Sequence, residues 1–159
     1  MSLSKPRPDE GERWLRLARR YLRFGTRSRA QLRTYLSNRH APEAVIADIV
    51  EACSREGRID DRVAAKLWVE TLANRGYALS AIRIQLSDRG FDDHAIEQAL
   101  NALRAREDDE QRARTMAAAF LKTSSGSASR GRRASVARRL ARRGFDPELI
   151  DRLLAHYDE

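Results

Sequence analysis

The sequence contains few of the residues that define several classes of protein. Its 159 residues include one cysteine, which excludes an internal disulfide framework and a zinc module built from several cysteines. Eight glycines and four prolines are too few for a β-rich chain with many tight turns. No apolar run approaches the ~18 residues of a membrane span, and the first ten residues do not form a signal peptide. We therefore expect a mostly helical, cytoplasmic protein that does not bind membranes.

Charged residues are abundant, at 34%, and most of the positive charge comes from arginine because lysine is scarce. The charge is unevenly distributed: residues 1–42 carry +8, residues 43–110 carry −6 and residues 111–159 carry +6. No acid interrupts the basic stretches 13–42 and 130–143. Arginine richness by itself fits a solvated surface. Clustering of arginine at both ends instead indicates a polyanionic partner, with phosphate as the expected anion.

The chain repeats itself. Three segments align without internal gaps, namely residues 29–53, 79–103 and 133–157. Corresponding residues lie 50 and then 54 positions apart, a period that indicates tandem copies of one supersecondary unit. The tetrapeptide Arg-Gly-Phe-Asp recurs verbatim at Arg89–Asp92 and Arg143–Asp146, whereas the first copy has His40 and Ala41 in place of Gly-Phe.

Each copy is expected to contain three helices. The first helix of each copy has an apolar face at helical spacing. We assign to these faces Trp14, Leu17, Ala18, Tyr21 and Leu22, then Val63, Leu67 and Leu72, then Met116, Ala119 and Phe120. Ser28 and Gln31 have the spacing of a capping box at the start of the second helix. Gly90 and Gly144 fit the left-handed position that ends a helix.

A three-helix unit of this size cannot build a large core alone, so neighbouring units should share apolar faces. We therefore predict an all-α fold of three tandem three-helix repeats that form an elongated, curved body. The predicted segments are a disordered N-terminus at residues 1–11, repeats at 12–56, 57–106 and 107–159, and a flexible linker at 123–131.

No catalytic or metal-binding constellation can be assembled from the sequence. No histidine lies four residues from another, the spacing that would favour metal ligation on a helix. The pairs Asp60-Asp61, Asp92-Asp93 and Asp108-Asp109 each precede an apolar helical run, where acids cap backbone N–H groups. We expect these acids to be caps, and we expect no cofactor, no metal and no enzymatic activity. Trp14 and Trp68 are assigned to the core, with base stacking as the alternative.

The arginine clusters are the candidate binding residues. The candidates are Arg16, Arg19, Arg20, Arg23, Arg27, Arg130, Arg132, Arg133, Arg138, Arg139 and Arg142. Guanidinium groups hold phosphates bidentately, and such contacts position a protein on DNA without reading its sequence. If about six phosphates are neutralised, the affinity for DNA should fall about a thousandfold between 50 and 200 mM salt. A helix-turn-helix is the alternative, although the pattern occurs three times and its recurrent residues are apolar or capping.

Several of these motifs together resemble a known family. The segment GRIDDRVA at residues 57–64, followed by RGY at 75–77 and IRIQLSDRG at 82–90, resembles the central signature of the RecX family. These proteins are bacterial regulators of the RecA recombinase. The segment SRAQLR at residues 28–33 is similar to the first-repeat pattern of the same family. The resemblance extends from Glu12 to Tyr157, nearly the whole chain.

The resemblance implies tandem three-helix repeats and also a function that the periodicity cannot give. Family members bind the RecA–DNA filament in its helical groove and inhibit its ATPase, strand-exchange and co-protease activities. For this chain the resemblance implies a RecA inhibitor that acts in DNA repair, DNA recombination and the SOS response, and we expect it to be a monomer. The arginine clusters predict contacts with single- and double-stranded DNA through phosphates, and the resemblance carries over no catalytic residues.

Our hypothesis from the sequence is a clamp on the filament. The two arginine-rich ends would face DNA phosphates or acidic recombinase surface, and the acidic middle copy would face basic recombinase elements. A non-enzymatic helical DNA-binding protein with phosphate-directed arginines is one alternative. A pure protein–protein adaptor, with solvated arginines, is another.

Overall fold

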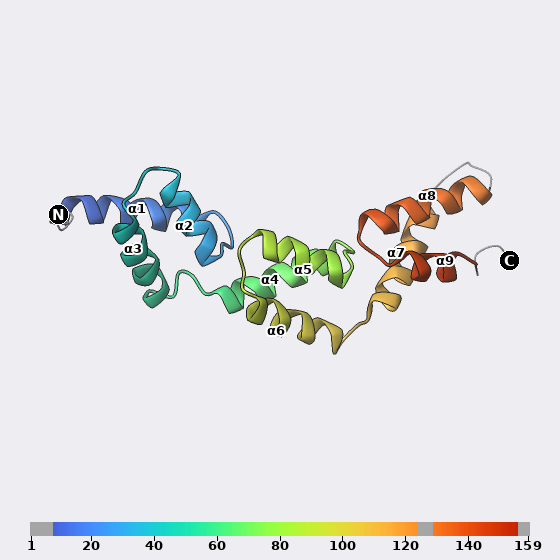
Figure 1. Cartoon of the computed structure of the whole chain (residues 1–159). Coiled ribbons are helices and arrows are strands. Elements are labelled where there is room, and N and C mark those ends of the chain that lie inside the picture. Colours follow the sequence, from blue (N-terminus) through green and yellow to red (C-terminus); the bar gives the residue numbers. More distant parts are fainter. Residues whose placement is uncertain (1–7, 124–128, 156–159) are drawn as a thin grey trace. The chain divides into compact units, whose positions relative to one another are not determined.

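The computed structural model of the protein describes residues 8–123 and 129–155 (Figure 1). Over these residues the chain forms nine α-helices and no strand, which confirms the all-α prediction. The helices are α1 (Pro8–Arg23), α2 (Arg29–Ser37), α3 (Glu43–Arg55), α4 (Asp61–Asn74), α5 (Leu79–Asp88), α6 (Asp93–Arg104), α7 (Asp109–Thr123), α8 (Ser129–Arg142) and α9 (Pro147–Ala155). Of these described helices, none is long and apolar enough to cross a membrane.

The nine helices follow the three aligned copies as the triplets α1–α3, α4–α6 and α7–α9. Helix α1 begins at Pro8 and helix α8 at Ser129, inside the segments for which we expected disorder and a flexible linker. The rest of those expectations falls on residues 1–7 and 124–128, which lie outside the described residues. The repeat boundaries stay a prediction.

The chain divides into two compact units. The first comprises Met1–Trp68 with Leu86–Ile96, and the second comprises Val69–Gln85 with Glu97–Glu159. The division passes through α4, α5 and α6. Each unit therefore combines one terminal triplet of helices with part of the middle triplet.

The core of the first unit is built by α1, α2 and α3 and confirms the predicted apolar face of α1. Its buried residues are Trp14, Ala18, Leu32, Leu36, Ala41, Val45, Ile46, Ile49, Val50, Cys53 and Ile59. Leu32 and Leu36 have no solvent exposure at all. Burial of each such leucine stabilises the fold by about 1.5–3 kcal/mol.

The core of the second unit is built mainly by α7, α8 and α9. Its buried residues are Ala78, Ala113, Ala117, Phe120, Val136, Leu140, Phe145, Leu149, Ile150, Leu153 and Leu154. Ala119, which we placed on the inner face of α7, is exposed instead. The small alanines of α7 leave room for the larger side chains of α8 and α9.

The predicted apolar face of α4 is wrong at two of its three residues. Val63 and Leu67 are 55% and 50% exposed, whereas Leu72 is buried as expected. The helix buries Ala65 and Val69 on the side that also carries Leu72. Spacing alone could not separate the two overlapping apolar stripes, because both have the helical period.

The predicted helix ends are confirmed by hydrogen bonds and backbone angles. Ser28 Oγ accepts from the N–H of Gln31, and Gln31 Oε1 accepts from the N–H of Ser28, both at 3.0 Å, which completes the capping box. Gly90 and Gly144 follow α5 and α8 with φ of 76° and 83°. At the equivalent position after α2, His40 has a φ of 63°. Histidine is one of the few side chains that enter this region with some frequency.

Candidate nucleic-acid interface

The arginine candidates on α1 differ in how firmly the fold holds them. Arg16, Arg20 and Arg23 are exposed. Arg16 forms an ion pair with Glu12, one turn earlier, at 3.7 Å, and such an exposed pair contributes only a few tenths of a kcal/mol. The guanidinium of Arg23 lies 5.7 Å from the ring centroid of its neighbour Phe24. These three arginines can therefore reach a phosphate at little cost to the fold.

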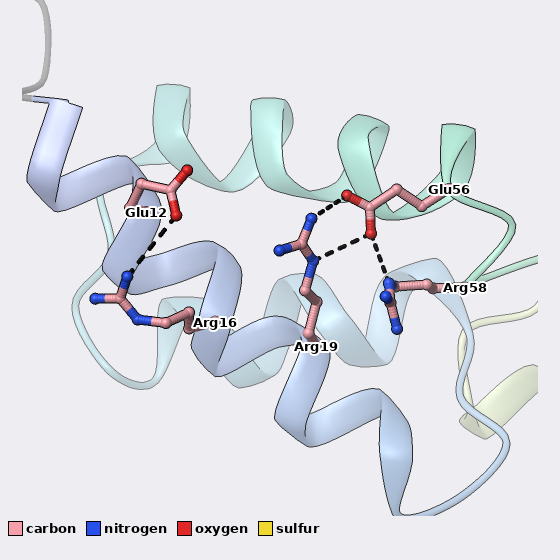
Figure 2. A network of polar contacts seen from close by, with 5 residues as sticks. All are labelled: Glu12, Arg16, Arg19, Glu56 and Arg58. Carbon is pink, nitrogen blue, oxygen red and sulfur yellow. Dashed lines mark hydrogen bonds and ion pairs between the residues drawn. The ribbon is translucent and has the colours of Figure 1, made fainter.

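Arg19 is part of a polar network that joins α1 to the end of α3 (Figure 2). Its Nε donates to Glu56 Oε2 at 3.1 Å, and its Nη2 donates to the other oxygen of the same carboxylate. Arg58 donates to Glu56 as well, at 2.5 Å. The hydrogen bonds from Arg19 and Arg58 lower the pKa of Glu56 to about 2. The hydrogen bond between Arg19 and Glu56 also raises the pKa of Arg19. Arg19 is thus engaged within the fold, and its role as a phosphate contact stays a prediction.

Arg27 is also engaged within the first unit. Its guanidinium lies 5.0 Å from the ring centroid of Tyr21. The Tyr21 ring stacks on Tyr35, with centroids 3.9 Å apart, and Arg39 lies 3.8 Å from the Tyr35 centroid. Each cation–π contact at such a site contributes about 0.5–1 kcal/mol. A phosphate would have to draw Arg27 away from this stack.

The C-terminal arginine cluster lies on α8. Arg138 and Arg142 are exposed, and neither forms an ion pair with another described residue. The guanidinium of Arg139 instead lies 3.7 Å from the ring centroid of Phe120, which is on α7. Arg138 and Arg142 are therefore the members of this cluster that are best placed to contact phosphate.

The remaining members of the C-terminal cluster contribute less. Arg132 and Arg133 are half-buried and interact within the chain. The side chain of Arg130 lies outside the part of the chain that the structure describes. The candidates that the structure leaves exposed are Arg16, Arg20, Arg23, Arg138 and Arg142.

The first acid of each aspartate pair serves as a helix cap, as predicted. Asp60 Oδ1 accepts from the N–H of Arg62 at 2.9 Å at the start of α4. Asp92 caps α6, and Asp108 caps α7 through the N–H of Gln111 at 2.8 Å. Among the described residues no group of three or more His, Cys, Asp or Glu is arranged to hold a metal ion.

The second acid of two of these pairs has a role that the sequence did not predict. Asp61 Oδ1 accepts from the N–H of Arg29 at 2.8 Å, and Asp109 Oδ1 accepts from the N–H of Leu79 at 3.0 Å. Each acid at the start of a first helix therefore caps the middle helix of the preceding copy. Burial raises the pKa of Asp61. These carboxylates accept hydrogen bonds inside the chain, so they are less available to pair with the cations of a partner.

The recurrent Arg-Gly-Phe-Asp tetrapeptide forms a joint between copies, which the sequence reading also missed. In the first unit, Ser28 Oγ at the start of α2 donates to the carbonyl of Arg89 at 2.5 Å. A Cβ on Gly90 would lie 2.4 Å from the Cβ of Ala30, so only glycine allows this approach. The guanidinium of Arg89 lies 4.1 Å from the Trp68 ring centroid, and Trp68 is half-buried at this joint.

The second unit repeats the same joint one copy later. The N–H of Ala78, just before α5, donates to the carbonyl of Arg143 at 2.9 Å, and Ser80 Oγ donates to the carbonyl of Gly144 at 2.9 Å. The guanidinium of Arg143 lies 4.7 Å from the Tyr77 ring centroid. Verbatim recurrence of the tetrapeptide, with a glycine that favours positive φ, was the signal that could have revealed the joint.

These features define the class of protein: an all-helical chain of tandem three-helix repeats with arginines exposed near both ends. The model of the second three-helix domain of RecX matches residues 60–100. The chain is 32% identical over 136 residues to "Regulatory protein RecX" of Thermobifida fusca (strain YX), which covers 85% of this chain and 73% of that protein. The chain belongs to the RecX family.

Further relatives agree with this assignment. "Regulatory protein RecX" of Chromohalobacter salexigens is 36% identical over 130 residues, covering 81% of this chain and 82% of that protein. The crystal structure of RecX from Lactobacillus salivarius matches with a TM-score of 0.74 at 24% identity, over 94% of this chain and 97% of that one. The structural match shows that the two proteins share the fold.

Proposed function

We propose that this chain inhibits the RecA recombinase by binding in the groove of the RecA–DNA filament, and so suppresses its ATPase, strand-exchange and co-protease activities. Membership of the RecX family is the observation that carries the proposal. The chain would act as a monomeric, non-enzymatic regulator in the cytoplasm, during DNA repair, recombination and the SOS response. It would contact single- and double-stranded DNA through phosphates.

The exposed arginines support the proposed DNA contact and revise its strength. Arg20, Arg23, Arg138 and Arg142 are exposed and form no ion pair with another described residue. If these four neutralise one phosphate each, the affinity for duplex DNA should fall roughly a hundredfold between 50 and 200 mM salt. This fall is smaller than the thousandfold that we expected from the sequence, because Arg19 and other candidates are engaged within the fold.

The first test is a titration of the single-stranded-DNA-dependent ATPase of the cognate RecA with this protein. Inhibition at well below one regulator per recombinase monomer would support binding to the filament. Absence of inhibition at any ratio, for a folded chain that still binds DNA, would contradict the proposal. The plain DNA-binding alternative would then be preferred.

A double variant tests the role of α8. Replacing Arg138 and Arg142 by alanine should make the negative slope of log K against log salt less steep, by roughly 1.4 for single-stranded DNA. The helicity of the chain should be unchanged. The matched control is the double replacement of Arg55 and Arg114, which are exposed and form ion pairs one turn away on their own helices. Equal slopes for the two double variants would remove α8 from the DNA contact.

A further inference from the structure

A groove of about 1170 Å³ opens on the first unit, where the end of α1 and the starts of α4 and α6 meet. Its lining includes Val63 and Leu67, which lie one turn apart on α4 and are each at least half exposed. Neither Phe, Tyr nor Trp occurs among the described residues that line it. The described lining does hold one smaller ring, the imidazole of exposed His94, so the two large aliphatic side chains, and not the absence of rings, are what favour an apolar protein side chain over a nucleobase.

The fold does not require apolar side chains at these two positions. Asp61 and Asp109 make the same capping contact, so α4 and α7 correspond with an offset of 48 residues. In α7 the residues equivalent to Val63 and Leu67 are therefore Gln111 and Thr115, which are polar and exposed. The third copy therefore forms without this apolar pair, which indicates that the pair serves a partner and not the repeat.

The described residues that line the groove include five arginines and three aspartates, so the lining is net positive. Arg23 and Arg62 line it, are exposed, and form no ion pair with another described residue. Two of the carboxylates in the lining, Asp60 and Asp92, accept hydrogen bonds from the N–H groups of helix starts. The position equivalent to Arg62 in α7 is Glu110, so the third copy also lacks this positive charge.

We propose that this groove docks an acidic segment of a partner protein. A bulky aliphatic side chain of the segment packs against Val63 and Leu67, and its carboxylates pair with Arg23 and Arg62. Apolar contact supplies most of the affinity, and the charges of Arg23 and Arg62 supply selectivity for acidic over basic segments. The proposal does not depend on inhibition of RecA, because it rests on the groove alone.

The test uses the full chain and a set of short fluorescein-labelled synthetic peptides in four classes: acidic with leucines, basic with leucines, neutral with leucines, and acidic without apolar residues. Fluorescence anisotropy should show the tightest binding for the acidic, leucine-containing class. A preference for basic peptides, or equal binding of all three leucine-containing classes, would overturn the proposal. Absence of binding by every acidic, leucine-containing peptide up to millimolar concentration would overturn it too.

Variants locate the binding to the groove. Leu67→Glu should weaken the peptide about tenfold to a hundredfold, the loss expected for one buried leucine contact. Ile84→Glu is the matched control, because Ile84 is 60% exposed and lies outside the groove. Equal affinities of these two variants would refute the site even if the peptide binds.

A charge reversal and a competition experiment complete the design. Arg62→Glu should weaken the acidic peptide more than Arg55→Glu, which reverses an exposed charge on α3 outside the groove. Arg23 is also a candidate phosphate contact, so the competition uses the Arg23→Ala chain; there an unlabelled oligonucleotide should not displace the peptide, and the Arg138 and Arg142 double variant should retain the peptide. Stoichiometric displacement by the oligonucleotide would show a nucleic-acid site instead. A failure of RecA inhibition would leave these peptide results unchanged, so the two proposals fail separately.

Discussion

Replacing Gly90 by alanine should destabilise the protein by about 2–5 kcal/mol, because two costs fall on one residue. Gly90 has a φ of 76°, and a left-handed conformation costs an L-residue about 1–2 kcal/mol. The new Cβ would lie 2.4 Å from the Cβ of Ala30, so one of the two elements must shift. Forcing extra atoms into a well-packed contact costs about 1–3 kcal/mol.

Two other glycines separate these costs. Gly57 has a φ of 66° but no atom within 4 Å of an added Cβ, so Gly57→Ala should lose only about 1–2 kcal/mol. Gly144 has a φ of 83°, and its added Cβ would lie 2.6 Å from the Cβ of Ala81. Gly144→Ala should therefore behave like Gly90→Ala, because it lies in the equivalent joint of the second unit.

Urea unfolding of the full chain, followed by circular dichroism, measures these differences. The double variant with Gly90→Ala and Ala30→Gly should recover about 1–3 kcal/mol of coupling, because the clashing methyl is removed. Ala30→Gly alone should cost no more than about 1 kcal/mol. Equal losses for Gly57→Ala and Gly90→Ala, or a coupling near zero, would refute the close approach of the two copies at this joint.

Two further predictions concern the first unit. The pKa of Glu56 is lowered from 4.5 to about 2, so the contribution of Glu56 to stability is complete above pH 4.5 and is lost as the pH falls toward 2. Thermal melts should show this loss in the natural chain and a smaller loss in Glu56→Gln. Identical pH profiles of the two chains would contradict the network. Ser28→Ala removes a helix cap and the hydrogen bond to Arg89, so it should lower the free energy of unfolding in urea by about 1–2 kcal/mol. A decrease below a few tenths of a kcal/mol would show that water replaces both hydrogen bonds.

The features that could be predicted from the sequence are those set by neighbours in the chain. Ser28 and Gln31 form their capping box within one helical turn. Gly90 has a positive φ directly after α5, so its role at the helix end depends only on nearby residues of the chain. The partner of Arg19 could not be predicted, because Glu56 lies 37 residues away and reaches Arg19 only after α1 packs on α3. The number of arginines in a sequence cluster is therefore larger than the number available to bind a phosphate.

The exposed apolar stripe of α4 could not be predicted for a different reason. Helical period identifies residues that share a face, but it does not say which face meets the core. Val63 and Leu67 lie four residues apart, as the buried residues Ala65 and Val69 do, so the spacing predicts a core position for both pairs. Comparison with α7 resolves the two stripes, since only the buried one is apolar in both helices.

The distinction between recurrent and unique residues extends to the proposed DNA contact. The alignment of the copies places Arg138 and Arg142 at exposed positions that carry Thr34 and Asn38 in the first copy. Because the fold accepts Thr and Asn there, Arg138→Thr with Arg142→Asn should leave the free energy of unfolding within about 0.5 kcal/mol. The same variant should lose affinity for DNA at moderate salt, measured by anisotropy on a labelled oligonucleotide. A loss of stability comparable to Gly90→Ala would mean that these arginines belong to the fold after all, and unchanged DNA binding would mean that their exposure serves another partner.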